Sequence, residues 1–192
     1  LHNRSVELAK KFGVQLVVRS SLNNSEGTIV KEGAKMEKML VSGVAGDSDT
    51  ARIAVVGLKD EPGVAFKLFN SLAKHNINVD MILQSVGRKG TKDISFTTSE
   101  ENADEAANVI KENFSNFESI DVDKKVAKVS IVGAGMQTNA GVGAKMFEAL
   151  YDENINIRMI STSEIRVTVL IDEVNTERAM SAVHDKFALG DR

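Results

Sequence analysis

One unit of sequence occurs twice in this chain, and this repeat constrains the fold more than any other feature. The stretch from Ala51 to Ile82, "ARIAVVGLKDEPGVAFKLFNSLAKHNINVDMI", corresponds to the stretch from Ala127 to Ile160, "AKVSIVGAGMQTNAGVGAKMFEALYDENINIRMI". The offset between the copies grows from 76 to 78 residues, because the second copy has two more residues in the loop before its helix. A repeat of this length predicts two copies of one structural unit.

The pattern inside each copy predicts a strand, a helix, a β-hairpin and a second helix. The opening segments are rich in β-branched residues, and Val64, Leu68 and Leu72 then recur at helical spacing, as do their counterparts in the second copy. The first copy closes with one more strand, which completes the order β-α-β-β-α-β. This order is typical of a ferredoxin-like α+β fold, an antiparallel sheet with helices on one face. Beyond the first helices, the predicted segments are strands 77–86, 92–99, 119–123, 155–163 and 164–172 and helices 102–114 and 175–187.

One strand of the second copy has to come from elsewhere in the chain. After its last predicted helix only "ALGDR" remains, so the second sheet is one strand short. The segment "MLVSGVA", Met39 to Ala45, lies before the first copy and has no partner of its own. Because natural proteins avoid unpaired sheet edges, we expect this segment to pair in the second sheet. The first unit is therefore predicted to be inserted into the second.

Composition excludes several functional classes. The 192 residues carry 24 Lys and Arg against 27 Asp and Glu, a net charge of -3, with no basic cluster of the kind that binds nucleic acid. There is no Cys, and the three His show no metal-ligand spacing. Neither a membrane span of roughly 18 apolar residues nor a signal-peptide pattern is present. We expect a cytoplasmic protein that binds no nucleic acid, no metal and no membrane, and no residue pair indicates catalysis.

The first 33 residues predict a separate α/β segment. Asn3 to Phe12 has the pattern of an amphipathic helix that ends at Gly13, and the apolar "VQLVVRS" that follows predicts a strand. "SLNNSEGT" then has the composition of a loop. Because the helix begins almost at Leu1, we expect this segment to be the end of a larger domain.

Together these segments resemble a known family, the tandem ACT-domain regulatory region of aspartate kinase, which phosphorylates aspartate at the head of lysine, threonine and methionine synthesis. The resemblance rests on "LHNRSVELAKKFGVQLVVRSSLNNSEGT", "VSGVAGDSDTARIAVVGLKDEPGVAFKLF", "INVDMILQSV", "VGAGMQTNAGVGAKMFEAL" and "ISTSEIRVTVLID", in the family's order. It implies a kinase-domain tail at 1–33, a first ACT domain at 49–124, and a second at 34–48 and 125–192. The family's catalytic motifs are absent from this sequence, so ATP and Mg are expected only in a kinase domain outside it.

The resemblance also implies an amino-acid effector, lysine and/or threonine, that acts by feedback inhibition. In the loop "KDEPGVAF", Pro62 at the first helical position and Gly63 after it leave backbone N–H groups for the α-carboxylate, and Asp60 is placed to accept the ammonium. In a simpler interpretation, Asp60 is the helix N-cap, the Pro-Gly pair is an ordinary turn and Asn78 and Asp80 are solvated loop residues. The candidate effector-binding residues of this copy are Asp60, Pro62, Gly63, Val64, Ala65, Asn78, Val79, Asp80 and Gln84.

The second copy departs from this pattern. Thr138, Asn139 and Ala140 stand where the first copy has Asp, Glu and Pro, so this loop has lost its acid, and Glu164 is the candidate replacement. In the simpler interpretation, Ser163 and Glu164 only form a turn between two strands. The candidate effector-binding residues of this copy are Gly141, Val142, Gly143, Asn156, Ile157, Ser163 and Glu164.

Three functions compete at this point. The first is a regulatory region of aspartate kinase that partners the kinase domain and forms homo-oligomers by side-by-side ACT pairing, since a four-stranded sheet leaves its edges open. The second is a stand-alone amino-acid sensor or a small subunit of another biosynthetic enzyme, which has no reason to carry residues 1–28. The third is a Rossmann-type enzyme, suggested by "GAGMQT", but Thr138 stands where the third Gly of that fingerprint belongs.

Overall fold

The computed structural model of the chain describes residues 2–30, 41–85, 90–133, 139 and 141–190. The chain forms two compact units, Leu1–Lys38 and Met39–Arg192, because most contacts between residues lie within one unit or the other. Among the described residues, no helix has the length and apolar character needed to cross a membrane.

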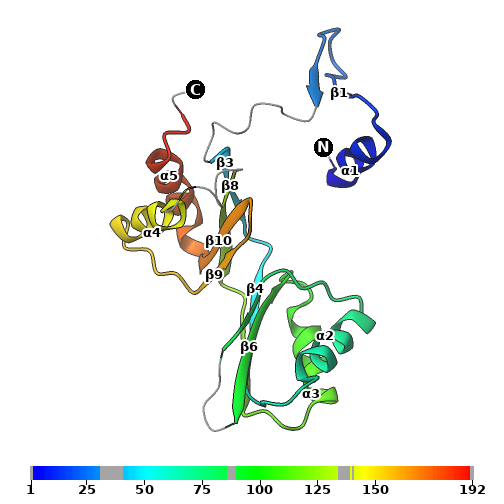
Figure 1. Cartoon of the computed structure of the whole chain (residues 1–192), viewed down its shortest axis with the longest axis vertical. Coiled ribbons are helices and arrows are strands. Elements are labelled where there is room, and N and C mark those ends of the chain that lie inside the picture. The colour runs from blue at the N-terminus through cyan, green and yellow to red at the C-terminus, as the bar shows by residue number, and fades with distance from the viewer. Residues whose placement is uncertain (1, 31–40, 86–89, 134–138, 140, 191–192) are drawn as a thin grey trace. The chain divides into compact units, whose positions relative to one another are not determined.

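The described residues of the first unit, 2–30, form one helix and a two-stranded sheet (Figure 1). Helix α1 (Asn3–Phe12) ends where the sequence predicts, because Gly13 adopts a left-handed φ of 62° and donates its N–H to the carbonyls of the last turn. Strand β1 (Leu16–Val18) lies in the predicted strand segment and pairs antiparallel with β2 (Thr28–Val30). The sequence pattern missed β2, since three residues are too few to show an alternation.

The second unit holds two four-stranded antiparallel sheets, in the orders β5-β6-β4-β7 and β3-β8-β10-β9. The first copy of the repeat builds the former sheet and the second copy builds three strands of the latter. The elements are β3 (Gly43–Asp47), β4 (Ala51–Lys59), α2 (Val64–Lys74), β5 (Ile82–Gln84), β6 (Thr91–Thr98), α3 (Ala103–Asn113), β7 (Ser119–Asp123), β8 (Val126–Val132), α4 (Val142–Asp152), β9 (Met159–Thr162), β10 (Arg166–Asp172), the 3-10 turn η2 (Glu173–Asn175) and α5 (Thr176–Lys186).

Strand β3 pairs in the sheet of the second copy, as the missing strand predicts. It runs antiparallel to β8, with Gly43 opposite Val132 and Asp47 opposite Lys128. The described strand begins and ends later in sequence than the predicted segment 39–45, whose first two residues lie outside the described residues. The first copy of the repeat is therefore inserted into the second copy, and the predicted α+β fold is confirmed.

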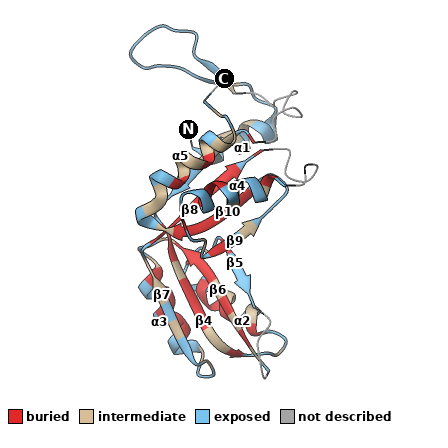
Figure 2. Cartoon of the chain, turned by 90° about the vertical axis from the view of Figure 1, so that its left-hand side faces the viewer, coloured by how far each residue is buried: buried red, intermediate tan, exposed pale blue. Residues whose placement is uncertain are grey.

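Each sheet packs against its own helices through a hydrophobic core. The buried strands are red in Figure 2. In the first copy, Leu68 and Leu72 of α2 are fully buried. Their counterparts at the offset of 78 residues, Met146 and Leu150 of α4, are fully buried as well. The i, i+4, i+8 stripe of each helix thus packs on its own sheet, as its spacing predicts.

The hairpin strand after α2 is shorter than its predicted segment, 77–86. Only Ile82–Gln84 forms a ladder with β6. Just before this strand, the N–H of Met81 donates to the Thr97 side-chain hydroxyl at 3.0 Å, so a side chain replaces one ladder bond. The end of the predicted segment, Val86, and most of the turn after it lie outside the described residues.

A third, small cluster joins the two sheets inside the second unit. It consists of Met81 from the first copy and Val126, Met159 and Leu170 from the second, each nearly inaccessible to solvent. Met81 and Met159 occupy the same position of the repeat, so the two copies present equivalent side chains to this junction. Asp80, next to Met81, therefore lies close to the sheet of the second copy.

Candidate effector site

The first-turn N–H groups of α2 are the predicted place for the α-carboxylate. Gly63 is the N-cap, with a left-handed φ of 91°, and it has no side chain to bond the first-turn N–H groups. Helix α4 starts in the same way at Gly141, with φ of 95°. The prediction that Pro62 occupies the first helical position is wrong, because the left-handed conformation of Gly63 starts the helix at Val64.

Asp60 does not cap the helix, and that simpler interpretation is also wrong. Its carboxylate Oδ1 lies 2.9 Å from Lys92 Nζ on β6, and its backbone N–H donates to the Gly90 carbonyl at 2.8 Å. The Lys92 side chain is only 11% exposed, whereas that of Asp60 is 53% exposed. Asp60 therefore already accepts one ammonium, that of a nearly buried lysine, and still reaches solvent.

The candidate residues of the first copy separate into two groups at opposite ends of its sheet. Asp60, Gly63 and the first helical residues follow the end of β4, and Gln84 lies toward the same end, paired with Ile94, which also pairs with Val55 of β4. Asn78, Val79 and Asp80 precede β5 at the other end, where the Asn78 carbonyl accepts the Thr98 hydroxyl at 2.8 Å. Val64 is buried and Ala65 half-buried, so both mainly pack on the core.

Asp80 contacts the sheet of the other copy. Its carboxylate accepts Lys128 Nζ at 2.8 Å and lies 3.9 Å from Arg166, and Lys128 also reaches Asp47 at 2.9 Å. Burial lowers the pKa of Lys128, but hydrogen bonds to Asp80 and Asp47 outweigh burial and raise the pKa above its ordinary 10.5. The sequence analysis missed Lys128; a lysine inside the apolar strand "VAKVSIV" was the available signal.

In the second copy, Ser163 and Glu164 form a β-hairpin turn. The Ser163 N–H donates to the Arg166 carbonyl at 2.7 Å, and Glu164 is exposed. The Gly133 N–H donates to Ile165 O at 2.9 Å, so this turn lies at the end of the sheet from which the chain leaves for Gly141. Val142 is buried and Gly143 half-buried there, whereas exposed Asn156 and half-buried Ile157 precede β9 at the other end; Thr138 and Ala140 lie outside the described residues.

Comparison with known proteins matches both copies of the repeat. The sequence profile of the ACT domain matches residues 53–114 and 129–187. An aspartokinase of Helicobacter pylori is 46% identical over 194 residues, covering 98% of this chain and 48% of that protein. Of the solved structures, one of aspartokinase alpha and beta subunits is 46% identical, with TM-score 0.73 over 78% of this chain and 99% of that one. The ligand-free regulatory subunit of aspartate kinase from Thermus thermophilus is 40% identical, with TM-score 0.73 over 77% of this chain and 99% of that one.

The chain belongs to the aspartokinase family, as a regulatory region of two ACT domains. It spans about half the length of the curated aspartokinases it matches, 48% in the Helicobacter pylori protein. The predicted resemblance is confirmed, while the roles of the individual candidate residues stay predictions. The predicted domain boundaries, at residues 33, 48 and 124, also stay predictions.

Proposed function

We propose that this chain binds lysine and/or threonine and thereby mediates feedback inhibition of aspartate phosphorylation. The observation that carries this proposal is the uncapped helix start at Gly63 with the exposed Asp60 carboxylate three residues before it. Such an arrangement suits a free amino acid, because backbone N–H groups favour the α-carboxylate and a carboxylate favours the ammonium.

The effector site is completed, in this proposal, by a second copy of the chain. The edge strands β5 and β9 expose apolar side chains, with Ile82 53%, Leu83 46% and Ile160 45% accessible. Antiparallel pairing of β5 with β9 of a second chain would bring Asn156 and Ile157, which precede β9, toward the end of β5 at Gln84. The residues at the Gln84 end of one chain, with Asp60 and Gly63, would then form one site with Asn156 and Ile157 of the other chain, and the exposed edges would be covered.

Calorimetric titration with lysine and threonine, separately and together, tests the binding step. Asp60→Asn should weaken binding on the order of ten- to a hundredfold, the value of a charge-assisted hydrogen bond. Thr138→Ala, at the matching loop position of the second copy, removes only a neutral hydroxyl and is the control. If Thr138→Ala abolishes binding while Asp60→Asn binds as the parent does, the effector site belongs to the second copy.

Two further measurements separate fold from function. A thermal melt of Asp60→Asn shows whether loss of the charge partner of Lys92 unfolds the protein. If it does, lost binding would report unfolding and not the loss of an effector contact. Sedimentation with and without amino acid tests the pairing, since a monomer under both conditions contradicts a site shared between chains.

Catalysis belongs, in the same proposal, to a kinase domain outside this chain. ATP and Mg are proposed to bind there, in the cytoplasm, and the 192 residues alone are proposed to form no aspartyl phosphate. In the complete enzyme, Asp60→Asn should leave the uninhibited rate unchanged and raise the amino-acid concentration needed for half-inhibition.

A further inference from the structure

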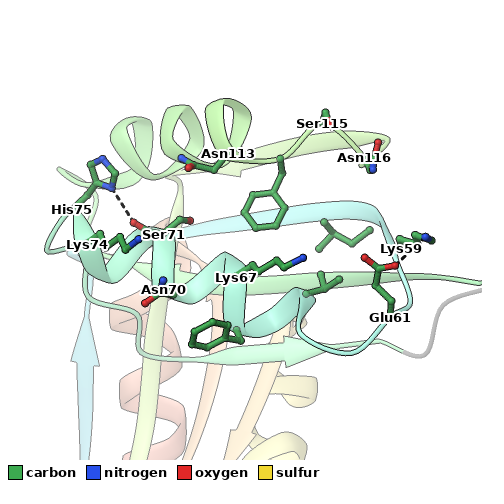
Figure 3. Close-up of a pocket in the computed structure, with 14 residues that line it drawn as sticks. Lys59, Glu61, Lys67, Asn70, Ser71, Lys74, His75, Asn113, Ser115 and Asn116 are labelled. Atoms are coloured by element: carbon green, nitrogen blue, oxygen red, sulfur yellow. Dashed lines mark hydrogen bonds and ion pairs between the residues drawn. The ribbon is translucent and has the colours of Figure 1, made fainter.

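A groove of about 390 Å³ lies on the helical side of the first ACT domain (Figure 3). One wall is α2, which presents Lys67, Asn70 and Lys74 at helical spacing, and the other is the end of α3 with Asn113 and the residues after it. Its volume is in the range of small-molecule sites, which are roughly 300 to 1,000 Å³.

The groove is positively charged in a negatively charged chain. Three lysines and one glutamate line it, whereas the whole chain carries a net charge of -3. The glutamate, Glu61, pairs with Lys59 at 2.9 Å at one end of the groove. Among the residues that the structure describes, Lys74 forms no ion pair, and the Asn113 amide donates only to its own helix, to Val109 O at 2.7 Å.

The repeat supplies an internal comparison for this groove. At the offset of 78 residues, Asn70 and Lys74 correspond to Glu148 and Asp152 of α4. Asn113, the last residue of α3, corresponds to Lys186, the last residue of α5. In the second copy these charges neutralise each other, since Lys186 Nζ lies 3.3 Å from Glu148 and 3.1 Å from Asp152.

The two copies therefore differ in how the same space is used. In the second copy, Lys145, which corresponds to Lys67, lies over the Phe187 ring with its Nζ 5.0 Å from the ring centroid. In the first copy the cations remain, but the facing helix supplies an amide where a counter-charge would be needed. Relative to the second copy, α2 lacks the two acids that α4 carries at the positions of Asn70 and Lys74.

We propose that this groove binds a small organic polyanion, a molecule with phosphate or carboxylate groups held by Lys67 and Lys74. The two lysines are seven residues apart on one face of α2, or about 10 Å along the helix axis, so a ligand with anionic groups at both ends fits best. Lysine is a compact point charge that binds phosphate and carboxylate without a bidentate geometry, and the side chains of Asn70 and Asn113 offer neutral donors between the charges. Phe66, which is 71% exposed, borders the same groove and can cover an apolar part of the ligand.

The test is a ¹⁵N–¹H NMR titration of the whole chain with fructose 1,6-bisphosphate and, separately, with citrate, each against KCl of equal ionic strength. We expect saturable shifts at the amides of residues 66–75 and 113–116. The double variant Lys67→Gln/Lys74→Gln should weaken binding on the order of tenfold or more. Binding of the bisphosphate alone identifies a phosphorylated ligand, and binding of citrate alone identifies a polycarboxylate.

Two matched variants keep the result decisive. Lys145→Gln removes the corresponding cation of the second copy and should leave the affinity unchanged. Asn113→Glu places on α3 an internal counter-charge for the lysines of α2, as Lys186 of α5 is for the acids of α4, and should block binding while the fold is retained. The proposal is overturned if neither probe gives saturable shifts, if the double lysine variant binds as the parent does, or if Lys145→Gln weakens binding equally. Because lysine and threonine play no part in this assay, its outcome is independent of the proposed effector function.

Discussion

The ion pair between Asp80 and Lys128 should couple the two ACT domains energetically. Lys128 lies on β8 of the second copy and Asp80 precedes β5 of the first, with 2.8 Å between Nζ and Oδ2. A cycle of Lys128→Met, Asp80→Asn and the double variant measures this coupling directly. Asp47→Asn is the matched control within one domain, because Asp47 Oδ2 lies 2.9 Å from the same Nζ.

The expected coupling energy lies between the values typical of exposed and of buried ion pairs. The Lys128 side chain is only 15% exposed, which strengthens the attraction, but Asp80 is 45% exposed and therefore screened by solvent. Exposed pairs contribute about 0.2 to 1 kcal/mol and breaking a buried pair costs about 3 to 5, so we expect a coupling of about 1 kcal/mol. The single variant Asp80→Asn should lower the free energy of unfolding by less than the loss expected for a buried pair, since Asp47 continues to neutralise the lysine.

Thermal unfolding followed by circular dichroism is the assay. For a unit of this size, about 1 kcal/mol corresponds to roughly 2 to 4 °C in Tm. A coupling below about 0.3 kcal/mol, which is within the error of additivity, refutes the argument that this contact joins the domains. If Asp47→Asn shows the coupling and Asp80→Asn does not, Lys128 stabilises only its own sheet.

Two further predictions concern the first ACT domain. Gly57 interrupts β4 with a left-handed φ of 74°, so Gly57→Ala should cost about 1 to 2 kcal/mol and lower Tm, whereas Gly43→Ala, where an added Cβ meets no atom within 4 Å, should change stability by less than about 0.5 kcal/mol. The hydrogen bond and attraction of Lys59, and then the charge of Lys67, lower the pKa of Glu61 below its ordinary 4.5, so a carbon NMR titration of its carboxyl should give a midpoint below that value, and Lys59→Gln should raise it. Because the folded pKa is the lower one, the stability from this pair is complete above the ordinary value and is lost as the pH falls through the folded pKa.

Local patterns determined most of the architecture. The repeat, the i, i+4, i+8 stripes and the missing last strand together predicted two α+β units, the first inserted into the second, and β3 pairs with β8 accordingly. Gly13 predicted the end of α1 because a left-handed residue is a local requirement of a helix C-cap. Such features depend on neighbouring residues in sequence, so one chain read alone can reveal them.

The partners of the charged residues were decided only by the tertiary structure. Asp60 pairs with Lys92 because β4 and β6 align Leu58 with Lys92 after a register shift between Val55 and Leu58. Gly57 is a sequence signal for an irregular strand, but it does not give the register that results. Asp80 meets Lys128 because the packing of Met81 against the second copy brings the two sheets together. The strength and direction of a charge interaction depend on distances across strands and domains, whereas hydrophobic periodicity records only which face of an element is buried.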